Sequence, residues 1–426
     1  MSDAASNAFA AVYPPEFAAH LARAWQAQED VPGLPSTAFL ESFIDTLYQA
    51  SFLKEEGEPI LCRAILSEPQ EWKQGEGPPA GFHVLRFASP RPFTTQEIRK
   101  LAPSASYYRT LLGVNCCSES GPQVWGIIAT GARWVNRVDG GRFFGAPLPA
   151  HLVVHILGPG RLLTACGYQR LLELVGGRVQ RTGFDPFKSK WLELRFRHVR
   201  TWLLERFSKM QIEGAEVGET FVRLMTQNVA RRIFSLVRRR HHGGMMISLP
   251  ADFPRSGCEN HWLRIRTCFE SAASTRRFSE LMLQLMGRMS IVGHTRGLKC
   301  VTWEDYQEME DFILSEIDES FIELSNLYAD LMNVDGALVV SENFELIGFG
   351  AEVIAENPVR QVYRALDVEA NETLMEQADN SGTRHRAAYR IVAAVQNCLA
   401  VVISQDGSIS FVANRNGQVV YWPYLP

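Results

Sequence analysis

Hydrophobic and polar residues follow two different periods along the first part of the chain. A helical period begins after Ser36, where one apolar stripe is formed by Phe39, Leu40, Phe43, Ile44 and Leu47. A capping pattern at residues 94–97 predicts a second, short helix. Apolar runs bounded by turn residues predict strands at 59–66, 83–87, 124–130, 152–157 and 162–166. Residues 1–187 are therefore predicted to form a mixed α+β domain, with a loose start before Ser36.

A helical linker is predicted next, over residues 188–217. Its apolar residues recur every three or four positions, at Leu192, Phe196, Val199, Leu203 and Phe207. This spacing is typical of a coiled-coil or bundle helix. Such a helix either carries a signal between domains or packs against a neighbouring sheet.

The remaining residues, 218–426, predict an α/β domain with a mixed sheet flanked by helices. A basic amphipathic helix over 222–237 leads into His242, two glycines and an apolar strand, and residues 251–302 predict a mostly helical insertion. An acidic helix follows, and further strands are predicted at 337–341, 344–349, 399–404, 408–413 and 418–422. Because Asp-Gly at 406–407 and Asn-Gly at 416–417 are hairpin signals, this sheet is expected to be partly antiparallel.

The bulk composition narrows the class of protein. The chain has 426 residues, enough for two or three domains, and its 46% hydrophobic and 21% charged residues are ordinary for a soluble globular protein. A net charge of −4 gives no general reason to expect binding to nucleic acid or to an anionic membrane. We therefore expect neither as a partner.

The sequence also bears on the compartment. No basic, then apolar, leader is present at the start, and no run of about 18 apolar residues occurs. The eight cysteines have irregular spacings, which do not indicate a disulfide framework. A zinc site is an alternative for some of them, but the spacing disfavours it; its candidate ligands are Cys258, His261, Cys268, His294 and Cys300. We expect a cytoplasmic protein.

Candidate chemistry is concentrated near the carboxyl end, in Ser381-Gly382-Thr383-Arg384-His385-Arg386. Apolar residues at helical spacing follow, so this stretch lies where a loop becomes a helix. The unpaired N–H groups and the dipole of a helix start attract anions. Arg384 and Arg386 carry forked donors suited to phosphate oxygens, and His385 can be neutral or charged near pH 7. Thr383 is expected to cap the helix or to donate to the ligand. The alternative is a solvated, arginine-rich first turn.

A second stretch, Asp335-Gly336-Ala337, comes directly before the predicted strand at 337–341. A carboxylate at the end of a strand could hold a divalent cation beside phosphate groups. The alternative is that Gly336 merely ends the preceding acidic helix as its C-terminal glycine.

Taken together, the two stretches resemble the diadenylate cyclase family. That family carries an Asp-Gly-Ala stretch and a Gly-Thr-Arg-His-Arg stretch in the same order, on a compact α/β domain. Ser404-Gln405 resembles the family's nucleotide-contacting Ser-Gln pair, and the strand after His242 resembles its first core strand. The resemblance covers about half of the chain, from Gly218 to Pro426.

The resemblance implies an enzyme that condenses two ATP into cyclic di-AMP. It implies Asp335, Arg384 and His385 as catalytic residues, with Asp335 as the ligand of Mg²⁺ or Mn²⁺. The implied nucleotide-binding residues are Gly336, Ala337, Gly382, Thr383, Arg384, His385, Arg386, Ser404 and Gln405. Because one domain of this family holds one ATP, a face-to-face homodimer or higher homo-oligomer is implied as well.

The first 187 residues resemble the predicted sensor domains, one of them called DACNV, that precede such cyclases. This implies control by an unknown ligand or partner. Two other functions compete with the cyclase. One is a cyclase-like domain without activity, which binds ATP or a cyclic nucleotide as a sensor; the other is a scaffold whose arginine-rich helix binds DNA or RNA.

Overall fold

The computed structural model describes residues 12–28, 31–73, 75, 77–78, 80–116, 121–132, 134–135, 142, 146–181, 185–240, 242–250, 253, 258–270, 273–356 and 358–424. The chain forms two compact units. The first comprises residues 1–138 and 143–183, and the second comprises residues 139–142 and 184–426. Each unit has its own sheet and its own hydrophobic core.

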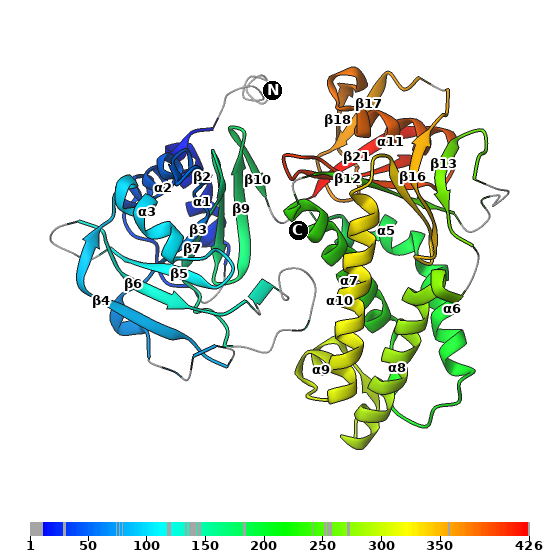
Figure 1. Cartoon of the computed structure of the whole chain (residues 1–426), viewed down its shortest axis with the longest axis horizontal. Coiled ribbons are helices and arrows are strands. Elements are labelled where there is room, and N and C mark those ends of the chain that lie inside the picture. Colours follow the sequence, from blue (N-terminus) through cyan, green and yellow to red (C-terminus); the bar gives the residue numbers. More distant parts are fainter. Residues whose placement is uncertain are drawn as a thin grey trace. The chain divides into compact units, whose positions relative to one another are not determined.

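The first unit is a curved sheet with helices on one face (Figure 1). Its helices are α1 (Pro14–Gln26), α2 (Thr37–Ser51) and α3 (Thr95–Leu101). Its strands are β1 (Lys54–Glu55), β2 (Glu58–Pro59), β3 (Cys62–Leu66), β4 (His83–Pro92), β5 (Thr110–Asn115), β6 (Gln123–Ala129), β7 (Leu152–Gly158), β8 (Arg161–Cys166), β9 (Gln169–Val175) and β10 (Arg178–Arg181). The main sheet has the order β10-β9-β8-β7-β3-β5-β6-β4, in which β3 and β5 are parallel.

Alternation along β3 separates two cores in this unit. Cys62, Ala64 and Leu66 face the helices and join the core formed with α1, α2 and α3. Ile65 faces the other way, into a smaller cluster that includes Trp125. The prediction of a loose start before Ser36 was wrong for α1, whose apolar residues Phe17, Leu21 and Trp25 are at most 3% exposed.

The second unit is a sheet between two helical layers. Its helices are α5 (Lys190–Arg195), α6 (Arg197–Ser208), α7 (Glu219–Arg239), α8 (Arg277–Thr295), α9 (Trp303–Glu308), α10 (Phe312–Met332) and α11 (Thr383–Ala394). Its strands are β11 (Glu216–Val217), β12 (Gly244–Leu249), β13 (Leu263–Cys268), β14 (Cys300–Val301), β15 (Ala337–Ser341), β16 (Leu346–Val353), β17 (Gln361–Ala365), β18 (Thr373–Gln377), β19 (Leu399–Ile403), β20 (Ile409–Arg415) and β21 (Gln418–Tyr424).

The sheet of this unit is mixed, in the order β13-β16-β15-β12-β19-β20-β21-β17-β18. β12 pairs with β15 in parallel and β17 with β21 in parallel, while the other pairs are antiparallel. Met245 and Ile247 of β12 face α11, whereas Met246 between them faces the layer of α7, α8 and α10. Those three helices lie side by side in Figure 1. The fold is the mixed α+β architecture that the sequence predicts.

Two predicted segments differ in form from the expectation. Residues 188–217 contain two helices, α5 and α6, rather than one, and their Trp191, Val199 and Leu203 belong to the main core of the second unit. The region 251–302 is not mostly a helical insertion, because β13 extends the sheet at its edge by pairing with β16. The other element there, α8, packs directly against α10.

Arg142 is part of the second unit and fills a polar site between α9 and α10. Its guanidinium forms an ion pair with Asp318, donates to the carbonyl oxygen of Met309 at 2.6 Å and lies 5.1 Å from the ring centre of Tyr306. Burial raises the pKa of Asp318, even though Arg142 opposes that shift. The side chain of Arg142 is 3% exposed, so these contacts replace its hydration.

The cysteines differ from the expectation in one place. Cys258 and Cys268, two of the five candidate zinc ligands, form a disulfide with a Cα–Cα distance of 5.9 Å. Cys300, another candidate, is free and exposed. Within the part of the chain that the structure describes, no helix has both the length and the apolar character needed to span a membrane.

Candidate nucleotide site

In the second unit, two strands begin and one strand ends at the same end of the sheet, which is called the sheet edge below. β12 and β15 are parallel, so both begin at this edge. β19 runs antiparallel to β12, with Ile403 opposite Gly244, so β19 ends there. Asp335 therefore lies just before β15, Gly243 just before β12 and Ser404 just after β19. The topology brings to one edge residues that are far apart in the sequence.

The closest packing at this edge is around Gly243. Its φ of +71° favours glycine, and a Cβ at this position would lie 2.7 Å from the carbonyl oxygen of Ile403. The same Cβ would lie 3.1 Å from Nη1 of Arg384 and 3.2 Å from the backbone nitrogen of Gln405. The glycine thus lets the Arg384 guanidinium lie against the backbone between the ends of β12 and β19.

The next residue links this cluster to the end of α10. A Cβ on Gly244 would lie 2.9 Å from the carbonyl oxygen of Met332, the last residue of α10. Asp335 follows Met332 after a short turn, and its side chain is exposed. The pair Gly243-Gly244 therefore packs against Arg384 through its first residue and against the segment that leads to Asp335 through its second.

Gly336 has a structural role of its own. Its φ is +107°, and a Cβ there would lie 2.6 Å from the carbonyl carbon of Gly350 and 2.9 Å from the nitrogen of Ala351. The residue that caps α10 is Asn333, not Gly336, so Gly336 is not simply the glycine that ends that helix. It allows the start of β15 to approach β16 closely, directly beside Asp335.

The first turn of α11 presents its backbone N–H groups without a side-chain cap. The N-cap residue is Gly382, which has extended backbone angles and no side chain that could accept from these groups. Of the two roles expected for Thr383, capping the helix was wrong, because Thr383 is the first residue inside it, whereas donation to a ligand stays a prediction. Gly382 and Thr383 are both exposed. The N–H groups of this turn are available to an anion.

His385 lies behind this turn. Its Nε2 is 3.3 Å from Oγ of Ser410, a buried hydroxyl on β20, and its ring packs against that of Tyr389 at 6.2 Å. Burial lowers the pKa of His385, and the carboxylate of Asp406 only partly opposes this. The imidazole is therefore mostly neutral at pH 7 and can donate one hydrogen bond and accept another.

The candidate residues differ in how far they reach solvent. Arg384, His385 and Ser404 are partly buried, and Ala337 is buried inside the sheet, where it pairs with Ala351. The exposed members are Asp335, Gly336, Gly382, Thr383, Arg386 and Gln405. No cluster of three or more His, Cys, Asp or Glu side chains that could hold a metal occurs among the residues placed in the structure. A divalent ion at Asp335 would need ligand oxygens from elsewhere.

Sequence reasoning did not select Gly243 and Ser410 as site residues. Gly243 was noted only as part of the entry into a strand, and its contact with Arg384 depends on the register between β12 and β19. Two consecutive glycines directly before a buried strand are a signal of close backbone approach that could have pointed to it. Ser410 lies within an ordinary strand, so no local signal marks it.

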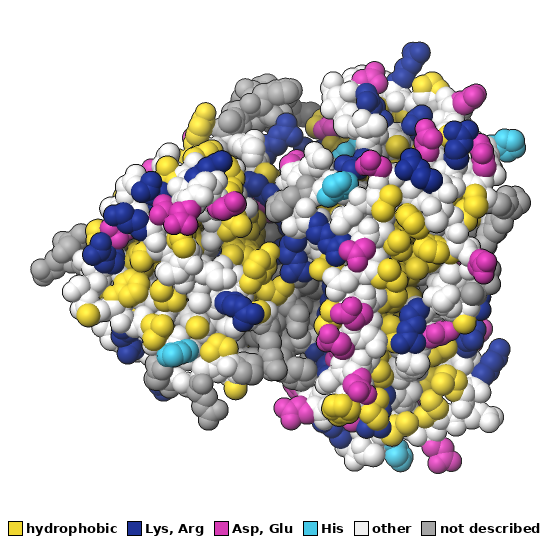
Figure 2. Space-filling model, viewed as in Figure 1, with side chains coloured by type: hydrophobic (Ala, Val, Ile, Leu, Met, Phe, Trp, Pro, Cys, Tyr) yellow, Lys and Arg dark blue, Asp and Glu magenta, His cyan; other side chains and the backbone are white. Residues whose placement is uncertain are grey.

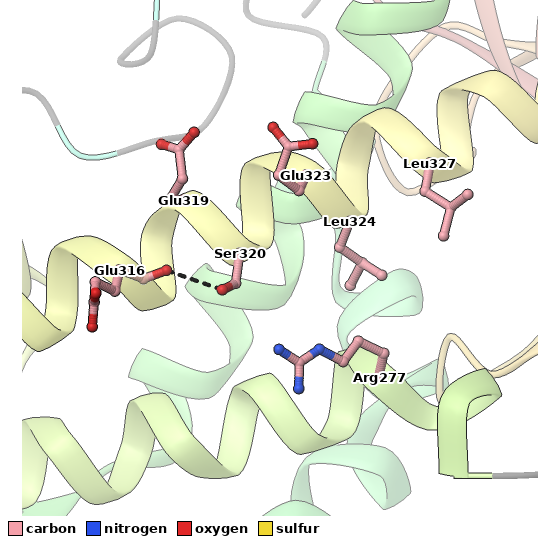
Figure 3. Close-up of a pocket in the computed structure, with 7 residues that line it drawn as sticks. All are labelled: Arg277, Glu316, Glu319, Ser320, Glu323, Leu324 and Leu327. Carbon is pink, nitrogen blue, oxygen red and sulfur yellow. Dashed lines mark hydrogen bonds between the residues drawn. The ribbon is translucent and has the colours of Figure 1, made fainter.

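A surface hollow of about 690 Å³ lies elsewhere, between α8 and α10. Figure 2 shows acidic side chains gathered over α10 on this face. In Figure 3, Arg277 of α8 lies below Ser320 and Leu324, whereas Glu319 and Glu323 point away from α8. The hollow includes none of the candidate residues, and its carboxylates would repel phosphate groups. It is not the candidate site.

This end of the sheet combines a carboxylate, closely approachable glycine backbone, an arginine and a helix N-terminus, which are groups suited to binding the phosphates of a nucleotide. The comparison with known families agrees. Residues 286–417 match the family model described as DisA bacterial checkpoint controller nucleotide-binding (DAC), and residues 29–129 match the model described as Probable sensor domain DACNV. The chain therefore carries a DACNV-type domain followed by a DAC-type nucleotide-binding domain. No curated protein and no solved structure matches the chain.

Proposed function

We propose that the second unit is a diadenylate cyclase, which joins two ATP into cyclic di-AMP. The observation that supports this most is the contact of Arg384 with the backbone at Gly243, beside the strand ends that carry Asp335 and Gln405. In the reaction, the 3′ oxygen of each ATP forms a bond to the α-phosphorus of the other. The bond from that phosphorus to the pyrophosphate group breaks, and the hydroxyl protons are released. Two ATP thus give one cyclic di-AMP and two pyrophosphates.

The residues of the chain act mainly by position and charge. The guanidinium of Arg384 and the open N–H groups at Gly382 and Thr383 would bind the phosphates, and Arg386 would add a second guanidinium at the exposed side. Neutral His385 would donate one hydrogen bond to a phosphate oxygen. Ser404 and Gln405 would contact the nucleotide from the end of β19.

Asp335 would hold a Mg²⁺ or Mn²⁺ ion together with phosphate oxygens of the nucleotide. This donor set fits, because Mg²⁺ is often bound by one or two carboxylates while phosphates and waters complete its coordination. When bound, the ion would offset the negative charge of the reacting phosphates. Asp335 would also orient the 3′ hydroxyl.

The exposure of Asp335, Gly382 and Gln405 favours catalysis between two copies of the chain. One site holds one ATP, so the second ATP has to come from a facing site. We propose a face-to-face homodimer and regulation of its formation by the DACNV-type domain. Light scattering of the full chain, with and without ATP, tests the dimer; a strictly monomeric chain that still makes product would contradict it.

The test of the reaction is incubation of the full chain with ATP and Mg²⁺ or Mn²⁺, followed by mass spectrometry for cyclic di-AMP. Asp335→Asn and Arg384→Ala should each lower the rate at least about 100-fold, because each removes a charge that faces the reacting phosphates. Arg415→Ala is the matched control, since Arg415 is the last residue of β20 and lies at the opposite end of the strands from the candidate site. It should keep the wild-type rate.

The binding-only alternative has a different result. A chain that binds ATP, loses that binding in Arg384→Ala and makes no product with either metal would be a nucleotide sensor rather than a cyclase. Product formation that is unchanged in both Asp335→Asn and Arg384→Ala would reject this site altogether.

A further inference from the structure

The first unit buries an arginine that has no carboxylate beside it among the described residues. Arg63 lies on β3 in the middle of the sheet, on the face away from α1 and α2, and it is fully buried. Its Nη2 donates to the carbonyl oxygen of Thr110 at 3.2 Å and to Oγ1 of Thr130 at 3.1 Å. Its Nε and Nη1 are buried and have no hydrogen-bond acceptor among the residues that the structure describes. Buried guanidinium donors are normally satisfied, so these two nitrogens need an explanation.

The charge on this guanidinium persists at neutral pH. Burial lowers the pKa of Arg63 to about 10, which still leaves it protonated. The neighbours that oppose this shift are Tyr107, Tyr168 and Cys62, and none of these described residues carries a carboxylate. A buried cation without an anion lowers the stability of the fold. Proteins keep such destabilising groups at functional sites, where a ligand can supply the opposite charge.

Aromatic side chains surround the guanidinium. The indole of Trp134 lies over it, 4.0 Å from the carbon Cζ to the ring centre, and the ring of Tyr107 lies 6.0 Å away. His155 is directly opposite Arg63 on β7, and its Nδ1 lies 3.0 Å from the hydroxyl of Tyr107. Tyr168 stacks parallel to Trp134 with ring centres 5.9 Å apart. The strands β3 and β7, which carry Arg63 and His155, are neighbours in Figure 1.

We propose that this cluster is the ligand site of the DACNV-type domain and that it binds a small organic carboxylate with a flat body. Nε and Nη1 of Arg63 donate to the carboxylate, and the rings of Trp134 and Tyr107 enclose the body. His155 is buried and its pKa lies well below the ordinary value, chiefly because of burial and then because of Arg63, so it stays neutral and adds no second charge.

The balance of charge selects the class of ligand. Arg170 also lowers the pKa of His155, but it is only partly buried, so Arg63 is the fully buried cation of this cluster. One fully buried cation neutralises a monoanion such as a carboxylate. A phosphate dianion would leave one negative charge inside an aromatic wall, where desolvating it is costly. Trp134, which is 3% exposed, covers the guanidinium in the structure. It has to move aside when a ligand binds, so its fluorescence reports the event.

The experiment uses the full chain with benzoate as the probe, benzamide as its uncharged isostere and inorganic phosphate as the other anion. Benzoate should change tryptophan fluorescence in a saturable way and slow hydrogen exchange in β3 and β7. Benzamide and phosphate should do neither. Arg63→Met should weaken benzoate binding about 10- to 100-fold, because it removes hydrogen bonds from a charged donor. Trp134→Phe should lose the fluorescence change and keep the slowed exchange.

Hydrogen exchange of the variants without added ligand distinguishes a ligand-binding role of Arg63 from a purely structural one. Arg63→Met should slow hydrogen exchange in β3 and β7 relative to the wild type, since it removes an uncompensated buried charge. Arg161→Met is the matched control, because it breaks an ion pair of 2.8 Å with Glu173, and it should speed exchange in β8 and β9. Faster exchange in Arg63→Met, with no response of the wild type to benzoate, would overturn the proposal. An equal benzoate response in wild type and Arg63→Met would show that Arg63 does not bind the carboxylate. A response to phosphate alone would show that the ligand is a phosphate and not a carboxylate.

Discussion

Replacing Gly336 by alanine tests whether the sheet next to Asp335 depends on the close approach of the backbones of β15 and β16. An alanine at a φ of +107° is strained by about 1–3 kcal/mol. Its Cβ would in addition meet backbone atoms of Gly350 and Ala351 at 2.6 and 2.9 Å, and the strands β15 and β16 would have to separate. Overpacking of this kind costs about a further 1–3 kcal/mol. We expect Gly336→Ala to lower the free energy of unfolding by about 2–6 kcal/mol, the sum of those two ranges.

Two other glycines separate the two causes. Gly417 has a φ of +84° with no atom within 4 Å of a Cβ, so Gly417→Ala should cost only the conformational strain of about 1–2 kcal/mol. A Cβ on Gly382 also meets nothing within 4 Å, and this residue has a negative φ, so Gly382→Ala should cost at most about 1 kcal/mol, because alanine is a poorer N-cap than glycine.

The assay is native-state hydrogen exchange of the full chain in increasing urea, read on the amides of β15 and β16. This isolates the stability of the second unit from that of the first. The reasoning would be refuted if Gly336→Ala cost no more than Gly417→Ala, because the close approach to β16 would then have no energetic effect.

Three further outcomes are expected. Leu21→Ala should destabilise the first unit by about 2–5 kcal/mol in urea unfolding, because Leu21 is fully buried on α1; a change below 1 kcal/mol would mean that α1 is dispensable. Gly243→Ala should weaken ATP binding, measured by calorimetry, because a Cβ would displace the Arg384 guanidinium. An unchanged affinity would mean that Arg384 does not bind the nucleotide. The hydrogen bonds from Arg288 lower the pKa of Asp311, so the stability from this pair is present above the unfolded pKa of about 3.9 and is lost as pH falls through the folded value. The difference in unfolding free energy between wild type and Arg288→Met should therefore be present at pH 7 and close below about pH 4, and a pH-independent difference would contradict this.

The sequence predicted best the elements whose pattern is set by burial alone. β15 and β19 are continuous apolar runs buried on both faces, and both were predicted within one residue. β17 and β18 were missed, because β18 is the edge strand of the sheet, β17 is its neighbour, and both alternate polar with apolar residues only weakly. β13 was missed although Leu263 and Ile265 alternate with the exposed Arg264 and Arg266, because it is a short strand at the other edge of the sheet.

The start of the chain shows a different kind of failure. The residues before Ser36 were predicted to be loose, but proline is well suited to the first turn of a helix, and here Pro14 begins α1. The spacing of Phe17, Leu21 and Trp25 at four residues carried the signal that was overlooked.

Membership of the candidate site could be predicted, but its assembly could not. The motif residues Asp335 and Arg384 stand in recognisable stretches, whereas the contact of Arg384 with Gly243 requires the pairing of β12 with β19. No local pattern encodes that pairing. The unpaired nitrogens of Arg63 are equally invisible in the sequence, because a single arginine within an apolar strand does not show what lies opposite to it.

The assignment of residues 139–142 to the second unit limits how the protein can be divided for experiments. A fragment that starts at residue 188 would lack the guanidinium of Arg142, which Asp318 and the carbonyl of Met309 bind inside the helical layer. Loss of activity in such a truncation would then reflect the missing Arg142 contacts in the second unit rather than the removal of a regulatory domain. Dissection by point substitution in the intact polypeptide avoids this ambiguity.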